Sequence, residues 1–127
     1  VIAQLGIPDM KLPISYAFSY PKRLHSKAPR LDFTQYATLT FEEPDMERFR
    51  NLAFAFDAVR KGGNMPCILN AANEVVVAAF LHDEIGFLQM SDVIEKTMAK
   101  ATFIPVPTYE DYVATDAEAR KIAEKLI

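Results

Sequence analysis

The sequence predicts a mainly α-helical protein with a small β portion, whose C-terminal residues form a four-helix bundle-like domain. Residues 66–81 (PCILNAANEVVVAAFL) are apolar on nearly every side, which is typical of a central buried helix. Three further segments after residue 44 have helical periodicity, and the short loops between them favour antiparallel packing. Two stretches before residue 44 are rich in residues that favour strands.

The N-terminal stretch is expected to form a strand followed by a short helix. Residues 1–7 (VIAQLGI) resemble a strand, which Gly6 and the Pro8-Asp9 pair would end. Because the chain opens directly in this run without a methionine, we expect that a preceding part has been removed. Pro13 suits the first turn of a helix. The buried face of that helix would hold Ile14, Ala17 and Phe18.

A connecting arm and a second strand follow. Residues 22–35 show no sustained period, which indicates an arm. Its basic residues could contact a phosphate or simply be solvated, and the second reading is favoured because basic side chains are normally exposed. Residues 36–42 (YATLTFE) alternate in polarity and predict a strand that ends at Pro44. The basic residues are Lys22, Arg23, Lys27 and Arg30.

Caps and apolar stripes predict the four helices of the C-terminal domain. Asp45 would cap the first and Gly62-Gly63 would end it, with its core stripe at Phe49, Leu52, Ala53, Phe56 and Val59. The central helix comes next. Ser91 would cap the third helix, which directs Val93, Ile94 and Met98 inward. A capping box of Thr115 and Glu118 would begin the last helix, which buries Ala119, Ile122, Ala123 and Leu126.

Composition bounds the class of protein. A chain of 127 residues that is 50% hydrophobic can bury one core. Its net charge of −3 argues against a general nucleic-acid binder, which would carry a basic face. With Cys67 as its single cysteine it has no disulfide framework or thiolate metal site, and a buried inert thiol is expected. No apolar run reaches the roughly 20 residues of a membrane span, so a cytoplasmic protein is predicted.

Few residues suggest chemistry. His25 and His82 have no carboxylate or cysteine at ligand spacing, and four glycines, two of them adjacent, make no phosphate loop. The most distinctive polar group is the cluster Asn70, Asn73 and Glu74, whose spacing of three and four places it on one helix face. A structural hydrogen-bonding role is favoured over a catalytic one, because polar groups beside a core need partners.

Three separated stretches, in order, carry a resemblance to a known family. AQLGIPDMKLPISYAFSYPKRL, LDFTQYATLTFEEPD and ILNAANEVVVAAFL closely resemble the C-terminal third of 1-deoxy-D-xylulose 5-phosphate reductoisomerase. The resemblance implies that residues 1–20 are the end of an α/β catalytic domain (strand, turn and short helix). It likewise implies that residues 21–44 are a connecting arm with a returning strand, and residues 45–127 the helical domain.

The resemblance also implies an activity. The family's enzymes convert 1-deoxy-D-xylulose 5-phosphate, a sugar phosphate, to 2-C-methyl-D-erythritol 4-phosphate, using NADPH and a divalent cation, Mg or Mn. Because the family's metal, phosphate and NADPH ligands lie in segments that precede Val1, we expect no catalytic, cofactor-binding or metal-binding residue here. Only the turn at residues 6–10 matches a segment beside the family's substrate pocket. Pro8 and Met10 are therefore the expected pocket neighbours.

Two hypotheses follow from different classes. In the first, the chain is a structural part of the reductoisomerase and is inactive alone. The alternative is an independent helical interaction module without catalysis. A strand edge without neighbours is a template for association, so a homodimer is also expected. Neither nucleic acid nor membrane is expected as a partner.

Overall fold

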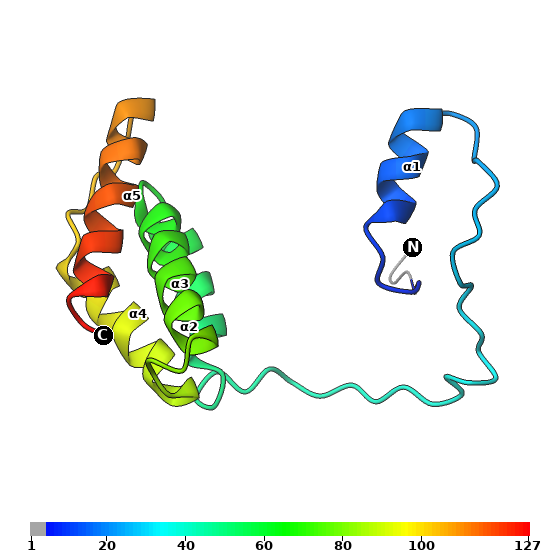
Figure 1. Ribbon diagram of the computed structural model, residues 1–127, viewed down its shortest axis with the longest axis horizontal. Helices are drawn as coiled ribbons and strands as arrows, with labels where there is room; N and C mark the ends of the chain where they lie inside the picture. The colour runs from blue at the N-terminus through cyan, green and yellow to red at the C-terminus, as the bar shows by residue number, and fades with distance from the viewer. Residues whose placement is uncertain (1–4) are drawn as a thin grey trace. The chain divides into compact units, whose positions relative to one another are not determined.

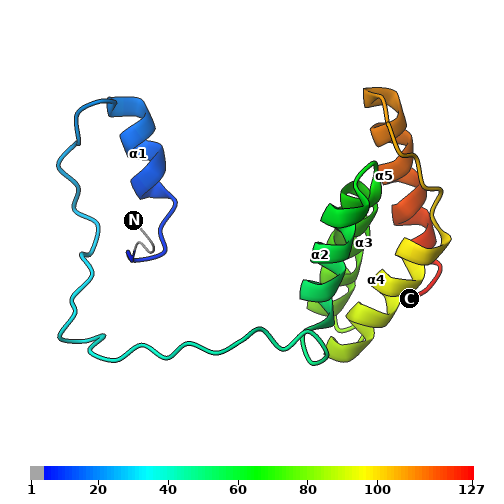
Figure 2. The same cartoon turned by 180° about the vertical axis from the view of Figure 1, so that it is seen from behind.

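The computed structural model describes residues 5–127 and divides the chain into two compact units, Val1–Glu42 and Glu43–Ile127. The described part of the first unit contains one helix, α1 (Lys11–Ser19). The second unit contains α2 (Arg50–Lys61), α3 (Met65–Leu81), α4 (Phe87–Lys100) and α5 (Tyr109–Glu124). Figures 1 and 2 show these four helices side by side. The predicted four-helix bundle-like domain is confirmed.

The predicted β portion is wrong for the residues that the structure describes. Residues 36–42 are exposed and are in no strand. The first predicted strand lies largely outside the described residues, and residues 5–7 are not strand. A strand requires a neighbour for its backbone N–H and C=O groups, and residues 5–127 contain none. Without strands, the remnant of an α/β domain expected before the helices is not supported.

Helix α1 begins at Lys11, which places Pro13 in its first turn as predicted, and Asp9 organises this turn. The Asp9 Oδ1 atom accepts a hydrogen bond of 2.9 Å from the Lys11 amide. The buried face predicted for this helix is wrong: Phe18 is 86% exposed and Ile14 is 49% exposed. Periodicity marks an apolar face but does not supply a surface to cover it, and the described residues of this unit supply none.

The central position predicted for residues 66–81 is confirmed in α3, which contacts α2, α4 and α5. Its buried side chains join two apolar clusters that meet at Leu69. Val77 and Leu81 on its outer side are exposed, so other residues do not cover the helix on every side. The side chains of α3 that the core buries are Met65, Ile68, Ala71, Ala72, Val76 and Ala79.

Helix α2 packs mainly through a different face from the predicted one, although the predicted Ala53 is half-buried. Ala58 is 1% exposed and Phe54 packs against the core, whereas Val59 is 74% exposed. We name the exposed residues Phe49, Leu52, Phe56 and Val59 the α2 stripe. The smaller face fits because a small residue at position 58 lets α2 approach Met65 and Ile68 of α3 closely.

Three predicted helix starts are corrected. The Asp45 Oδ1 atom accepts from the amides of residues 47 and 48 and closes a separate turn before α2. Helix α4 begins after Gly86, so Ser91 lies within it and donates its hydroxyl hydrogen to Asn51 Oδ1 at 3.0 Å. Helix α5 begins after its N-cap Thr108, whose hydroxyl accepts from the Asp111 amide at 3.2 Å. The predicted inward residues of α4 and α5 are confirmed as buried or half-buried.

The turn between α2 and α3 is joined to the rest of the domain by Asn64, a fully buried amide with 0% exposure. Its Nδ2 atom donates to Thr102 O and Thr115 Oγ1, both at 2.9 Å. Its Oδ1 atom accepts from the Ile104 amide at 2.9 Å. Gly63 before it has φ of +56°, and a Cβ there would lie 2.3 Å from Ile104 O. Only glycine fits this contact.

We expect Asn64→Ala to lower the free energy of unfolding by about 2 to 4 kcal/mol, because it leaves buried polar groups unpaired. Asn73→Ala, on the exposed side of α3, is the matched control and should change the free energy of unfolding by less than about 0.5 kcal/mol. Urea unfolding of the 127-residue chain, followed by circular dichroism, measures both. Equal effects of the two substitutions would contradict this role for Asn64.

Candidate functional site

The predicted pocket neighbours Pro8 and Met10 lie in the turn before α1. This turn, α1 and the following arm surround an open hollow of about 810 Å³, which Pro8, Met10, Tyr16 and Arg23 help to line. Met10 is 71% exposed, and Pro8 is exposed too. The turn therefore presents a rigid proline and a flexible thioether to the hollow.

The polar groups around this hollow are already engaged. The Asp9 carboxylate accepts from the Lys11 amide. The Arg23 guanidinium lies over the Tyr16 ring, 4.8 Å from its centroid. The described residues of this hollow can shape an apolar pocket, but none of them is a free base at hydrogen-bond reach.

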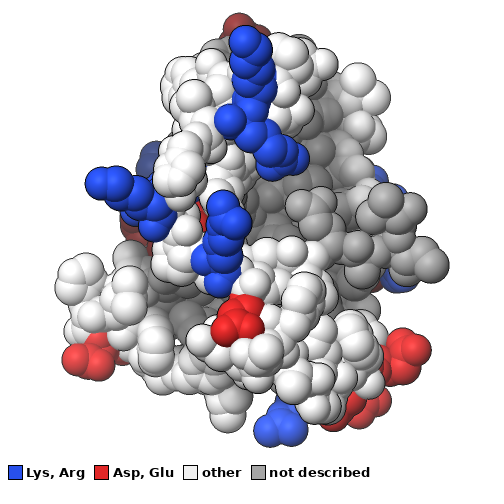
Figure 3. All heavy atoms as spheres, turned by 90° about the vertical axis from the view of Figure 1, so that its right-hand side faces the viewer, with Lys and Arg blue, Asp and Glu red and all other residues white. Residues whose placement is uncertain are grey.

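The basic residues predicted in the arm are exposed. In the view of Figure 3 the Lys and Arg side chains stand singly or in small groups among uncharged residues. The described residues visible in this view thus form no continuous basic patch, a feature typical of nucleic-acid binders.

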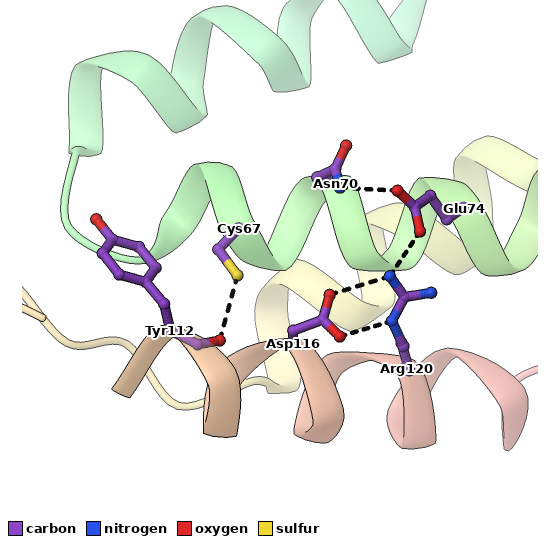
Figure 4. Close-up of polar contacts among 6 residues, drawn as sticks. All are labelled: Cys67, Asn70, Glu74, Tyr112, Asp116 and Arg120. Atoms are coloured by element: carbon purple, nitrogen blue, oxygen red, sulfur yellow. Dashed lines mark hydrogen bonds and ion pairs between the residues drawn. The ribbon is translucent and has the colours of Figure 1, made fainter. Parts of the chain in front are cut away.

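Asn70 and Glu74 of the predicted cluster on α3 form a polar network with Asp116 and Arg120 of α5 (Figure 4). We call these four residues the clamp. Arg120 makes a bidentate contact with Asp116, with Nε at 2.7 Å from Oδ2 and Nη2 at 3.1 Å from Oδ1. The same Nη2 atom donates to Glu74 Oε2 at 2.6 Å. Asn70 Nδ2 donates to Glu74 Oε1 at 3.1 Å. Both oxygens of Glu74 are therefore occupied.

The structure separates Asn73 from this clamp. Asn73 is exposed and makes no side-chain hydrogen bond within residues 5–127. It lines a hollow of about 360 Å³ between α2 and α3, together with Asn51 and Asn70. Glu74 thus joins α3 to α5, Asn70 pairs with its other oxygen from within α3, and Asn73 lies in the groove beside α2.

The clamp shifts the ionisation of its members. The hydrogen bond from Arg120, followed by that from Asn70, holds the pKa of Glu74 below its ordinary value. The hydrogen bonds to Asp116 and Glu74 raise the pKa of Arg120. A carboxylate bound in this way stays ionised and is poorly suited to proton transfer near neutral pH.

Cys67 lies one turn before Asn70 and is half-buried. Its Sγ atom lies 3.6 Å from Tyr112 O, and burial raises the pKa of its thiol. A neutral thiol is a poor nucleophile and a poor metal ligand. This position supports the inert thiol predicted from the sequence.

The carboxylates, imidazoles and thiol of residues 5–127 are scattered over the structure. No three His, Cys, Asp or Glu side chains in this range lie close enough to hold a metal ion. The donor set described here therefore does not fit a divalent cation. None of the helices described is long and apolar enough to cross a membrane.

Comparison with known proteins identifies the family. The family model for the DXP reductoisomerase C-terminal domain matches residues 5–122. The chain belongs to the DXP reductoisomerase family. It is 70% identical over 127 residues to the 1-deoxy-D-xylulose 5-phosphate reductoisomerase of Bacteroides thetaiotaomicron and 68% identical over 125 residues to that of Bacteroides fragilis. The matched region is 100% and 98% of this chain, but only 33% and 32% of the two relatives.

Solved reductoisomerase structures share the fold. The enzyme from Zymomonas mobilis in complex with NADPH matches with a TM-score of 0.84 and 44% identity, covering 98% of this chain and 33% of that one. A DOX-P reductoisomerase in complex with NADPH, fosmidomycin and magnesium matches with a TM-score of 0.82 and 34% identity, with the same coverage. The chain therefore spans about a third of a reductoisomerase.

Sequence reasoning missed the α5 half of the clamp. Asp116 and Arg120 are four residues apart, a spacing at which opposite charges on one helix meet. The sequence alone could therefore have predicted this ion pair. Their contact with Glu74 could not be predicted in this way, because it joins residues 46 positions apart. Asn64 was missed for the same reason.

The clamp predicts a pH dependence. Because the folded-state pKa of Glu74 lies below its ordinary value of 4.5, the stability it contributes is present above pH 4.5 and is lost as the pH falls through the folded pKa. Urea midpoints of the wild-type chain and Glu74→Gln should therefore differ most at pH 7 and converge in acid. Glu47→Gln, which removes an exposed carboxylate with no ion pair among the described residues, should show little difference at either pH. If the difference in urea midpoint between the wild type and Glu74→Gln does not become smaller in acid, the clamp is contradicted.

Proposed function

We propose that this chain is the C-terminal part of an NADPH- and metal-dependent reductoisomerase that converts 1-deoxy-D-xylulose 5-phosphate to 2-C-methyl-D-erythritol 4-phosphate, a step towards isoprenoid precursors. The 70% identity to the Bacteroides thetaiotaomicron enzyme, which extends over all 127 residues, is the observation that carries this proposal. The solved relatives with NADPH and magnesium support the same cofactors for the whole enzyme.

Within such an enzyme this chain has a supporting role. Residues 1–20 would end the catalytic domain, residues 21–44 would form the connecting arm, and residues 45–127 the helical domain. The magnesium or manganese ion and the NADPH would be held by residues outside this chain, since its described carboxylates form no metal-ligand cluster. Assembly as a homodimer and a cytoplasmic location remain predictions from the sequence.

Pro8 and Met10 are the residues of this chain that we place beside the substrate. The proline fixes the turn, and the methionine offers an apolar, polarisable surface. Neither can transfer a proton or bind Mg²⁺. Their role is to shape the pocket and to exclude water from it.

A chimaera tests the proposed function. The chain replaces its 127-residue counterpart in the Bacteroides thetaiotaomicron enzyme, and NADPH oxidation is followed with 1-deoxy-D-xylulose 5-phosphate. We expect an active chimaera that loses activity on chelation and regains it with Mg²⁺. The 127-residue chain alone should show no turnover. A folded but inactive chimaera would favour the independent helical module instead.

Met10→Ala in the chimaera should weaken substrate or fosmidomycin binding by about 1 to 2 kcal/mol, the scale of a lost apolar contact. The Mg²⁺ dependence should not change, because a thioether is not among the ligands of this ion. Met46→Ala, at another exposed methionine in the second unit, is the control. Steady-state kinetics measure both variants, and wild-type binding and turnover in Met10→Ala would show that Met10 has only a packing role.

A further inference from the structure

The α2 stripe is an apolar surface that the rest of the second unit leaves exposed. Its four residues follow one another at spacings of three, four and three, so they lie along one side of the helix. Phe49 is 59% exposed and Val59 is 74% exposed. Contiguous apolar surface of this kind marks an interaction site more often than a free surface.

Guanidinium groups flank the stripe. Arg48 lies over the Phe49 ring and Arg60 over the Phe56 ring, each 5.9 Å from the ring centroid. Aromatic and arginine side chains are enriched where proteins bind one another, with the apolar groups at the centre and the charges at the rim. The partner surface should therefore be apolar at its centre and carry carboxylates at its edge.

The stripe continues into the groove between α2 and α3. Val59 belongs to both, and the groove of about 360 Å³ is also lined by Ala55, Leu69, Asn70 and Asn73. The Asn73 amide has no hydrogen-bond partner among the described residues. A side-chain amide offers both donors and an acceptor, so it can pair with the backbone of a segment laid into the groove.

We propose that the α2 stripe and this groove form the surface on which the remaining two thirds of the reductoisomerase dock. The proposal rests on the proposed function. Relatives about three times as long, of which the chain covers 33%, supply the occupant. A helical domain at the end of an arm needs a packed contact to hold a fixed position, since domains joined by small polar contacts move freely.

The experiment compares the same substitutions in two settings, the 127-residue chain and the chimaera. Phe56→Asp places a charge in the middle of the stripe. Val113→Asp is the matched control, because it also replaces an exposed apolar residue but lies on α5, which makes no contact with α2. Phe56→Ala, which adds no charge, is the milder second variant.

In the isolated chain, Phe56→Asp should leave the melting temperature within about 1 °C, because the ring is already exposed to water. In the chimaera it should lower the melting temperature by about 3 to 6 °C, Phe56→Ala should lower it by less, and Val113→Asp should leave it unchanged. Hydroxyl-radical oxidation of Phe49 and Phe56 should fall several-fold from the isolated chain to the wild-type chimaera.

Two outcomes would overturn the docking proposal. One is an active chimaera in which Phe49 and Phe56 are oxidised as in the isolated chain and Phe56→Asp has no added effect; the proposed function would then still stand. The other is an isolated chain that sediments as a dimer and that Phe56→Asp converts to monomer, which would assign the stripe to a second copy. An inactive wild-type chimaera would instead count against the proposed function.

Discussion

The second unit depends on one buried side chain, Asn64. A fully buried amide is costly unless each of its polar atoms is paired, and here both Nδ2 and Oδ1 are. Its partners are in the segment before α5 and in α5 itself. These three hydrogen bonds fix the α2–α3 turn against residues 102–104 and against Thr115 within α5.

The two sides of α3 have different roles in the domain. One side supplies the core, where small residues let α2 and α5 approach closely. Beyond the core, Glu74 holds Arg120 of α5, while Asn73 and the groove face outward beside α2. An exposed ion pair adds little stability by itself, so the clamp fixes register between helices that apolar packing has already brought together.

Family membership and the described chemistry are consistent because the chain is about a third of its relatives. A solved relative binds NADPH and magnesium, whereas the described residues of this chain form no metal-ligand cluster. The roles that we propose for this chain are those of a scaffold, a pocket edge and a docking surface. Met10 in the turn at residues 6–10 and the residues of the α2 stripe are among the exposed apolar side chains of this chain. Such surface often marks a contact with another molecule or domain.

The sequence by itself determined that four helices follow residue 44, that residues 66–81 lie at their centre, and which family the chain resembles. Periodicity and turn residues are local signals, and local signals suffice for helices. Only the tertiary structure decided which apolar face of α2 packs inward, because that depends on the shape of α3. It also placed Thr115 inside α5 rather than at its start, since the hydroxyl pairs with Asn64, 51 residues away. The predicted strand at residues 36–42 did not form, because strand patterns require a partner that the described chain does not contain.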